Sequence, residues 1–311
     1  MTVIKEWSCP RIWLSRLCSL PQQLLLIHRR NRLELLQSYN PKSHTMAGTP
    51  LKYVSKLSGT WVLIIGGTSG IGFAVAEAAL EHGASVILSG SNPTRLADAI
   101  HRLKTSYPDR AAQVSGQTCD LSQPQSIESN LSALFDAAAA AATRPIDHIV
   151  FTAGDPLKIV PISESIVETI QNAGTVRFLG PLMVAKLAPK YLAPGPASSI
   201  TLTSGTNGAK PIPGWTVQAA WNTSLEGMTR GLAVDLKPVR VNLVSPGAVH
   251  TERFGDVAED KMEEFLRRMR EATTTGEVGR PEDVAEAYLY AMKDRFLSGT
   301  IISSDGGRLL A

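Results

Sequence analysis

The sequence predicts an α/β protein in which a doubly wound parallel sheet forms a single domain over residues 46–311. Two observations carry this prediction. From Leu51 onward, short apolar runs alternate with amphipathic stretches, which is the pattern of strand–helix–strand units. The first run, residues 61–65, is apolar throughout, as expected of a strand covered on both faces. Because no repeat of 20–50 residues is visible, we exclude a solenoid.

The first half of the domain alternates regularly. After the strand at 61–65, a helix is expected over 71–82, because Gly83 has the position of a helix-terminating glycine. A second strand is expected at 85–88. The next helix begins with Asn92 as N-cap and Pro93 in its first turn. A third strand is expected at 113–120 and an alanine-rich helix at 131–142.

The second half continues the alternation with one long and one charged helix. Strands are expected at 146–152, 199–203, 239–244 and 299–304. A long helix is expected over 163–190, with a break near Gly180-Pro181, where proline removes a helical hydrogen bond. A further helix is marked by an apolar face at Trp221, Leu225, Met228 and Leu232. A polar, charged helix is expected over 256–275.

Composition limits the classes of function. The net charge of +3 over 311 residues is too small to indicate a nucleic-acid partner. No apolar run approaches the roughly 20 residues needed to span a bilayer, so we expect no membrane segment. The three cysteines have no paired spacing, so we expect neither a disulfide framework nor a metal site. These features favour a reduced, cytoplasmic setting.

Residues 1–45 differ from the rest of the chain. They contain seven lysines and arginines but only two glutamates. Such a basic, acid-poor segment is compatible with a mitochondrial transit peptide. It is equally compatible with a disordered arm, or with a non-native extension upstream of a start at Met46.

A glycine-rich turn, GGTSGIG at residues 66–72, lies between the first strand and the helix that follows it. Glycines in such a turn allow the backbone to approach a pyrophosphate, whose charge is stabilised at the helix N-terminus. The turn therefore predicts a Rossmann-type dinucleotide site. The residues expected to bind the cofactor here are Gly66, Thr68, Ser69, Gly70, Ile71 and Gly72.

The turn resembles the TGxxxGxG signature of the short-chain dehydrogenase/reductases, with Ile65 in place of Thr. Further segments resemble motifs of that family in the same order along the chain. They are Cys119-Asp120-Leu121, FTAG at 151–154 (NNAG in the family), RVNLVSPG at 240–247, GRPED at 279–283 and DGG at 305–307. The chain is therefore identified as a member of this family over about residues 55–308.

The resemblance implies roles for several residues outside the turn. It places Asp120 against the adenine ring, and Val249 and Thr251 against the nicotinamide carboxamide. It also implies a small-molecule substrate and a homodimer or homotetramer formed through the long helices that carry Arg177 and Leu225.

The end of the second strand favours NADP(H) over NAD(H). NAD-binding proteins of this fold carry an acidic residue here that contacts the ribose 2′-hydroxyl and repels a 2′-phosphate. Residues 88–93 read LSGSNP and contain no acid. Hydroxyl and amide groups at a helix N-terminus can bind a phosphate. We expect Ser89, Ser91 and Asn92 to do so, and Ser91 and Asn92 could equally cap the helix.

The catalytic residues depart from the family pattern. The resemblance places Gln218 where the family has its proton-donating Tyr, and Asn222 where it has Lys. Arg177 occupies the Asn position, and the Ser position falls at Ser204 or Gly205. Because an amide has no readily transferable proton, Gln218 cannot act as a general acid. We take Ser204, Arg177 and Gln218 as the catalytic candidates, with Arg177 and Asn222 also facing the cofactor.

Three functions are compatible with such a site. The first is hydride transfer from NADPH to an activated C=N, C=O or C=C bond that needs little proton assistance. The second is a non-redox cyclisation in a cofactor-assisted pocket, and the third is cofactor binding without chemistry. PIPGW at 211–215 and Arg177 resemble a divergent fungal natural-product branch of the family, which includes NADPH-dependent iminium reductases that guide a Diels–Alder reaction. Those relatives carry Asp at the position of Ile212.

Four further features have two interpretations each. Trp221 is expected to pack in the core or against a subunit, with substrate contact as the alternative. Trp215 lies in a Pro/Gly loop and could either pack or line the substrate cleft. His250 could be a replacement acid, but the simpler interpretation is a solvated loop residue. The helix over 256–275 could be a substrate lid or a solvated surface helix.

Overall fold

A seven-stranded, all-parallel sheet organises the protein, as the sequence predicted. The computed structural model describes residues 51–155, 159–252, 254 and 258–311. The strand order is β3-β2-β1-β4-β5-β6-β7, so strands are added on one side of β1 as far as β3 and on its other side from β4 onward. The strands are β1 (Trp61–Ile65), β2 (Ser85–Gly90), β3 (Val114–Thr118), β4 (His148–Phe151), β5 (Ser199–Thr203), β6 (Arg240–Pro246) and β7 (Ile301–Ser304).

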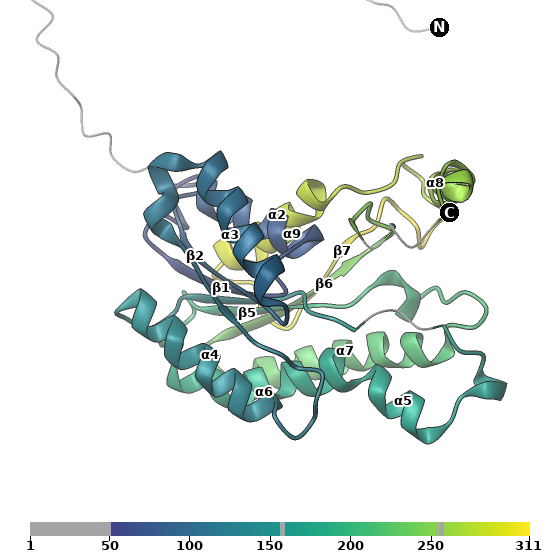
Figure 1. Ribbon diagram of the computed structural model, residues 1–311, viewed down its shortest axis with the longest axis horizontal. Coiled ribbons are helices and arrows are strands. Elements are labelled where there is room, and N and C mark those ends of the chain that lie inside the picture. Colours follow the sequence, from purple (N-terminus) through teal and green to yellow (C-terminus); the bar gives the residue numbers. More distant parts are fainter. Residues whose placement is uncertain (1–50, 156–158, 253, 255–257) are drawn as a thin grey trace, which may run out of the picture. The chain divides into compact units, whose positions relative to one another are not determined.

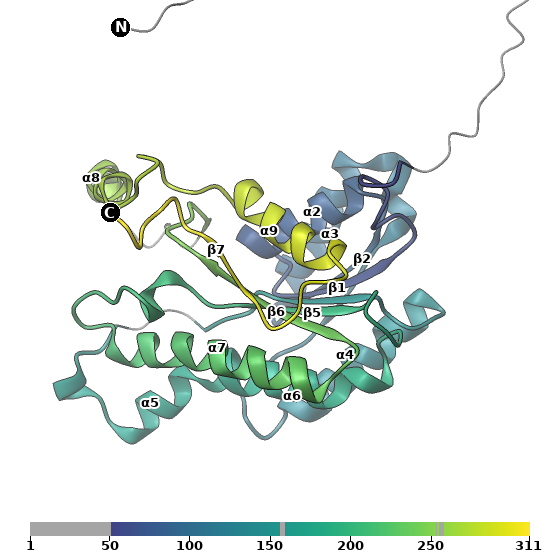
Figure 2. The same ribbon diagram turned by 180° about the vertical axis from the view of Figure 1, so that it is seen from behind.

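Helices cover both faces of the sheet (Figures 1 and 2). One face is covered by α2 (Gly70–Glu81), α3 (Pro93–Ser106) and α9 (Pro281–Lys293). The other is covered by α4 (Ile127–Ala142), α6 (Gly180–Leu187) and α7 (Thr216–Asp235), with α5 (Val167–Ala173) beside α7. Two apolar cores result: Ile64 packs in the first with α2 and α9, whereas its neighbours Leu63 and Ile65 pack in the second with α4. This alternation explains why residues 61–65 are apolar throughout.

Some elements differ from the sequence-based expectation. The long helix predicted over 163–190 consists of α5, a π-helical turn (Thr175–Leu179), α6 and a 3₁₀ turn (Ala188–Lys190). The irregularity begins at Gly174, six residues before the predicted break, and Pro181 instead lies in the first turn of α6. Helix α9 was not anticipated. The charged helix is α8 (Glu259–Glu271), and short 3₁₀ turns occur at Pro108–Gln113, Ile162–Glu164 and Thr206–Gly208.

The amino-terminal ends of the central strands are held by buried polar groups. Arg240, at the start of β6, donates hydrogen bonds to the carbonyls of Ala291 and Met292, which end α9, and to those of Pro196 and Leu297 (2.6–3.2 Å). His148, at the start of β4, has its ring Nδ1 2.9 Å from Ser199 Oγ. Burial, together with the positive charge of Arg240, lowers the pKa of His148 to about 3. These groups therefore support the fold at the end of the sheet opposite the glycine turn.

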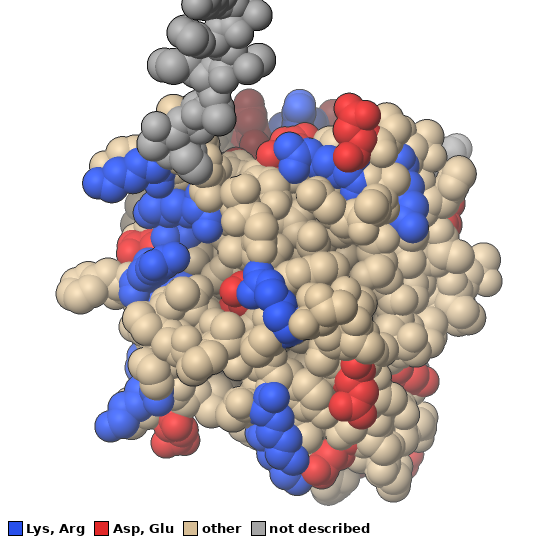
Figure 3. All heavy atoms as spheres, turned by 90° about the vertical axis from the view of Figure 1, so that its left-hand side faces the viewer, with Lys and Arg blue, Asp and Glu red and all other residues tan. Residues whose placement is uncertain are grey.

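The side of the molecule shown in Figure 3 carries basic and acidic side chains spread over a largely uncharged surface, without one continuous basic patch. Within the part of the chain that the structure describes, no helix is long and apolar enough to cross a membrane. The predicted tail over residues 1–45 lies outside the described residues.

Candidate functional site

The glycine turn lies at the carboxyl end of β1, against the segment that follows β4. Gly66 has φ +96°, and a Cβ on it would lie 2.4 Å from the backbone nitrogen of Ala153. A Cβ on Gly72 would lie 2.2 Å from the Gly66 carbonyl oxygen and 2.4 Å from Thr152 Oγ1. Any side chain at either position would displace backbone, so this turn requires glycine.

The end of β2 supports the turn from the next strand. The Ser89 carbonyl accepts hydrogen bonds from Gly66 N (2.8 Å) and Gly67 N (3.0 Å). The Ser89 side chain is fully buried, so it has no surface to offer a cofactor. This corrects the expectation that Ser89 contacts the phosphate: its role is to hold the turn through its backbone. A Cβ on Gly90 would lie 2.7 Å from Thr68 Cγ2, which places Thr68 beside the strand end.

Ser91, Asn92 and Asp120 lie exposed next to this turn. The side-chain oxygen of Asn92 accepts from Arg95 N at 3.0 Å, so Asn92 caps α3 as the sequence suggested. Asp120 follows β3, and Cys119 N donates to the Gly90 carbonyl at 3.0 Å, which brings the two strand ends together. The Asp120 carboxylate accepts from Ser122 N at 2.9 Å. Burial raises the pKa of the neighbouring Cys119 thiol to about 12, so this cysteine is not a nucleophile.

Arg177 lies on the π-helical turn and reaches the segment after β4. Its Nη2 donates to the Asp155 carbonyl at 2.9 Å, and a Cβ on Gly154 would lie 2.6 Å from its guanidinium carbon. The Asp155 carboxylate in turn accepts from Val176 N at 3.3 Å. The guanidinium is therefore held flat against Gly154. Asp155 was not among the residues predicted from the sequence, although it directly follows the motif at 151–154.

The three remaining candidates lie around the carboxyl end of β5. Ser204 follows the strand directly, and its backbone nitrogen donates to the Val244 carbonyl at 2.9 Å. Gln218 and Asn222 lie one turn apart on α7, and Gln218 is only 8% exposed. A Cβ on Gly205 would lie 3.7 Å from the Asn222 amide nitrogen and 3.8 Å from the Pro246 carbonyl oxygen. Asn222 therefore lies between the ends of β5 and β6.

A partly buried hydroxyl pair, not predicted from the sequence, holds the ends of β4 and β5. Thr203 Oγ1 donates to the Phe151 carbonyl at 2.7 Å and lies 2.7 Å from the hydroxyl of Tyr288. Since the Thr203 proton is used on the carbonyl, Tyr288 donates to Thr203. Burial raises the pKa of Tyr288, so this tyrosine is a poor proton donor near neutral pH.

The segment after β6 meets the glycine turn. A Cβ on Gly70 would lie 3.1 Å from Thr251 Cγ2, and the Glu252 carboxylate accepts from Gly70 N at 2.9 Å. Val249 is buried and pairs with Gly279. His250 is exposed, and its ring lies 5.5 Å from that of Phe254, which agrees with a loop residue. On α8, Phe265 lies against Phe254 while the polar face is occupied by Arg–Glu pairs such as Arg267–Glu264.

Trp221, on α7, packs against α5 and the π-helical turn. Its indole donates to the Ile170 carbonyl at 3.1 Å, and its ring lies 4.8 Å from that of Phe178. A Cβ on Gly174 would lie 2.6 Å from the indole, so glycine there allows the π-helical turn to approach α7. The packing interpretation of Trp221 is therefore confirmed. Trp215 lies half-buried immediately before α7.

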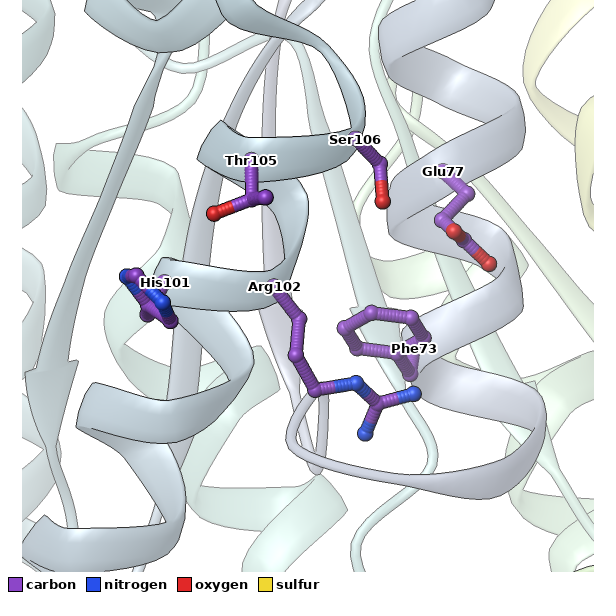
Figure 4. A pocket seen from close by; sticks show the side chains of 6 residues that line it. All are labelled: Phe73, Glu77, His101, Arg102, Thr105 and Ser106. Atoms are coloured by element: carbon purple, nitrogen blue, oxygen red, sulfur yellow. The ribbon is translucent and has the colours of Figure 1, made fainter.

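One surface hollow lies between α2 and α3 (Figure 4). It has a volume of about 270 Å³ and is lined by Phe73, Glu77, His101, Arg102, Thr105 and Ser106. The Arg102 guanidinium carbon lies 4.2 Å from the centroid of the Phe73 ring. None of the predicted functional residues lines this hollow, so we do not assign it to the site.

The site as a whole fits a dinucleotide. The glycines at 66 and 72 leave open the space that side chains would fill, and the N-terminus of α2 starts at Gly70 beside it. In a doubly wound sheet, ligands bind at the carboxyl edge where the strand order reverses, here between β1 and β4. Fold and site thus define a Rossmann-type nucleotide-binding protein.

Comparison with known proteins gives the family. Residues 53–311 match the family described as SDR-like Rossmann domain, and the chain belongs to the short-chain dehydrogenase/reductases. It is 49% identical over 256 residues to the short-chain dehydrogenase/reductase malC of Malbranchea aurantiaca, covering 82% of this chain and 96% of that protein. It is 43% identical over 262 residues to fsr5 of Gibberella fujikuroi, covering 84% and 98%. The predicted family and its fungal branch are therefore confirmed.

Two solved structures extend the comparison. The structure of MalC, described as a reductase/Diels–Alderase, superimposes with a TM-score of 0.79 at 48% identity, over 83% of this chain and all of that one. A small-chain dehydrogenase in complex with NADPH superimposes with a TM-score of 0.63 at 28% identity, over 81% and 99%. Both share the fold, and the second carries a nicotinamide dinucleotide.

Proposed function

We propose that this protein is an NADP(H)-dependent oxidoreductase of fungal secondary metabolism that transfers hydride to a small substrate with an activated C=N, C=O or C=C bond. The observation that carries this proposal is the turn at 66–72, where Gly66 and Gly72 are held against backbone at distances that no side chain permits. A bound nicotinamide would supply the hydride. The similarity to a protein described as a reductase/Diels–Alderase supports a reductase activity.

The protein's own residues would bind and orient rather than donate a proton. Asp155 accepts a hydrogen bond from the Arg177 guanidinium, whose positive charge can stabilise a developing negative charge. Gln218 can donate a hydrogen bond through its amide but cannot supply a proton. Ser204 offers a hydroxyl at the end of β5. A site of this kind suits an acceptor that is already electron-poor, such as an iminium ion.

The preference for NADP(H) rests on the exposed end of β2. Ser91 and the start of α3 provide a hydroxyl and a helix N-terminus there, with no acid in residues 88–93. Replacing Ser91 by Asp places a carboxylate where the 2′-phosphate would lie. We expect Ser91→Asp to weaken NADPH binding by about tenfold or more and to leave NADH binding within about twofold of wild type. An unchanged affinity for NADPH would remove Ser91 from this role.

The direct test of hydride transfer is NADPH oxidation at 340 nm with a panel of cyclic iminium ions, enones and ketones. We expect turnover with at least one iminium ion or enone and slower reaction with plain ketones, which need more proton assistance. NADPH binding without oxidation by any member of the panel would contradict hydride transfer and favour a cofactor-binding protein without chemistry.

Two substitutions test the roles of the candidate residues. Arg177→Ala should lower kcat by about 10²-fold, the loss typical of removing an anion-stabilising donor. Gln218→Ala should lower it by less than about tenfold, because no proton transfer is lost. Arg102→Ala, which removes an exposed arginine on α3, is the matched control and should leave kcat unchanged. Wild-type kinetics for Arg177→Ala would remove Arg177 from the mechanism.

A cofactor-assisted cyclisation is the second candidate, and the relative described as a reductase/Diels–Alderase favours it. Ile212, 41% exposed, occupies the position where the resembling branch has Asp, so this chain supplies no acid there. Cyclised product formed from an unsaturated substrate without NADPH oxidation would support this activity.

Assembly and location complete the proposal. A hollow of about 290 Å³ between α6 and α7, lined by Phe178, Leu182, Met228 and Leu232 among others, is consistent with pairing of these helices into a homodimer or homotetramer. Light scattering on the purified protein tests this, and a monomer would contradict it.

We propose a cytoplasmic location. A mature N-terminus cleaved within residues 1–45, in mitochondria, would instead indicate a transit peptide.

A further inference from the structure

Glu252 forms an unusual contact at the N-terminus of α2. Its Oε2 accepts a hydrogen bond from Gly70 N at 2.9 Å, across 182 residues of sequence. The neighbouring Thr251 places its methyl group 3.1 Å from where a Cβ on Gly70 would lie, which brings this segment directly against the turn. Glu252 is exposed, so no packing forces its carboxylate into this position.

The N-terminus of α2 otherwise carries no anion of its own. Its first turn contains no acidic residue, and Ser69, which precedes the helix, makes no side-chain capping hydrogen bond. Both the unsatisfied N–H groups and the helix dipole favour a negative charge at this point. Glu252 supplies that charge from the loop after β6.

A dinucleotide pyrophosphate would bind at the same place. In turns of this geometry the phosphate oxygens lie at the helix N-terminus, on the backbone N–H groups of the first turn. The Gly70 N–H cannot donate a full hydrogen bond to both anions, and two negative charges a few ångströms apart repel each other. The Glu252 carboxylate must therefore leave Gly70 N when the pyrophosphate arrives.

We propose that Glu252 is an internal competitor of the cofactor: its carboxylate occupies the pyrophosphate position in the free protein and lowers the apparent affinity for the dinucleotide. This inference rests on the proposed function, because it assumes that the turn at 66–72 binds a dinucleotide. Apparent affinity falls by the fraction of molecules in which the site is open. The contact thus sets the cofactor concentration at which the site fills, without changing the residues that hold the cofactor.

The test is the dissociation constant of NADPH, measured by fluorescence titration on the wild type and three variants. Glu252→Gln removes the charge, and we expect it to bind NADPH about 5- to 10-fold more tightly, which corresponds to about 1–1.4 kcal/mol. Glu252→Asp keeps the charge but shortens the side chain by one methylene, so that it no longer reaches Gly70 N. We expect Glu252→Asp to bind NADPH more tightly than the wild type as well. Glu286→Gln, an exposed glutamate on α9, is the matched control and should show no change.

A second probe locates the effect. Adenosine 2′-phosphate carries the adenosine part of NADPH without the pyrophosphate, and its affinity should be the same in the wild type and Glu252→Gln. The competitor role is overturned if Glu252→Gln binds NADPH no more tightly than the wild type. It is also overturned if Glu252→Asp behaves as the wild type, because the effect would then come from charge alone. Failure of the wild type to bind NADPH would instead refute the proposed function.

Discussion

The contact between Gly66 and the segment after β4 gives a quantitative test of the glycine turn. Gly66→Ala adds one methyl group at a position with φ +96°, 2.4 Å from Ala153 N. The left-handed conformation costs a non-glycine residue about 1–2 kcal/mol. Overpacking against backbone adds about 1–3 kcal/mol. We therefore expect Gly66→Ala to lower the free energy of unfolding by about 2–5 kcal/mol.

Gly59→Ala separates the two contributions. Gly59 lies just before the other end of β1 and has φ +73°, but no atom lies within 4 Å of the Cβ it would gain. It should therefore show only the conformational cost, about 1–2 kcal/mol. Urea unfolding measures both variants, and NADPH titration completes the comparison. Gly66→Ala should weaken NADPH binding by about tenfold or more, whereas Gly59→Ala should leave it unchanged. Equal stability loss and equal affinity in the two variants would refute the close-approach argument.

Three further predictions concern the fold. The pKa of a histidine is about 6.5 in the unfolded chain, whereas the pKa of His148 in the folded protein is about 3. The free energy of unfolding should therefore fall by up to about 1.4 kcal/mol per pH unit as the pH drops from 6.5 toward 3. His148→Asn should flatten that slope in urea unfolding at pH 4.5–7, and an unchanged slope would contradict burial of a neutral ring. Arg240→Met removes the side-chain donor of the Pro196, Ala291 and Met292 carbonyls, whereas the Leu297 carbonyl keeps its bond from Asn242, and should cost about 3 kcal/mol or more. A loss under about 1 kcal/mol would contradict this role of Arg240. Gly174→Ala should cost about 1–3 kcal/mol by displacing Trp221, and wild-type stability would disprove the packing of that indole.

The sequence predicts the fold well because its signals are local. An unbroken apolar run marks a strand covered on both faces, and Asn92-Pro93 marks a helix start by capping chemistry. The break in the long helix was placed at Gly180-Pro181 because proline removes a hydrogen bond there. The structure places it from Gly174, where the cause is tertiary: the indole of Trp221 occupies the space a side chain would need. Such a contact between distant segments leaves no periodic signal.

In the candidate site, too, features with a local sequence signal could be predicted and features that depend on tertiary contacts could not. The turn at 66–72 is readable from its glycines, and the resemblance locates Arg177, Gln218 and Asn222. The contact of Glu252 with Gly70, the support of Arg177 by Asp155 and the Tyr288–Thr203 pair all depend on how loops and helices meet at the carboxyl edge. Ser89 shows the converse, since its position in the strand predicted a ligand contact but the strand's packing buries its side chain.

The most direct test of the central claim is an equilibrium titration of the wild-type protein with NADPH and with NADH. The glycine turn predicts saturable binding of both dinucleotides, and the acid-free end of β2 predicts that NADPH binds more tightly by about tenfold. Tighter binding of NADH would contradict the assignment of Ser91 and the α3 N-terminus to the 2′-phosphate. Absence of binding by either dinucleotide would contradict the account of the turn itself.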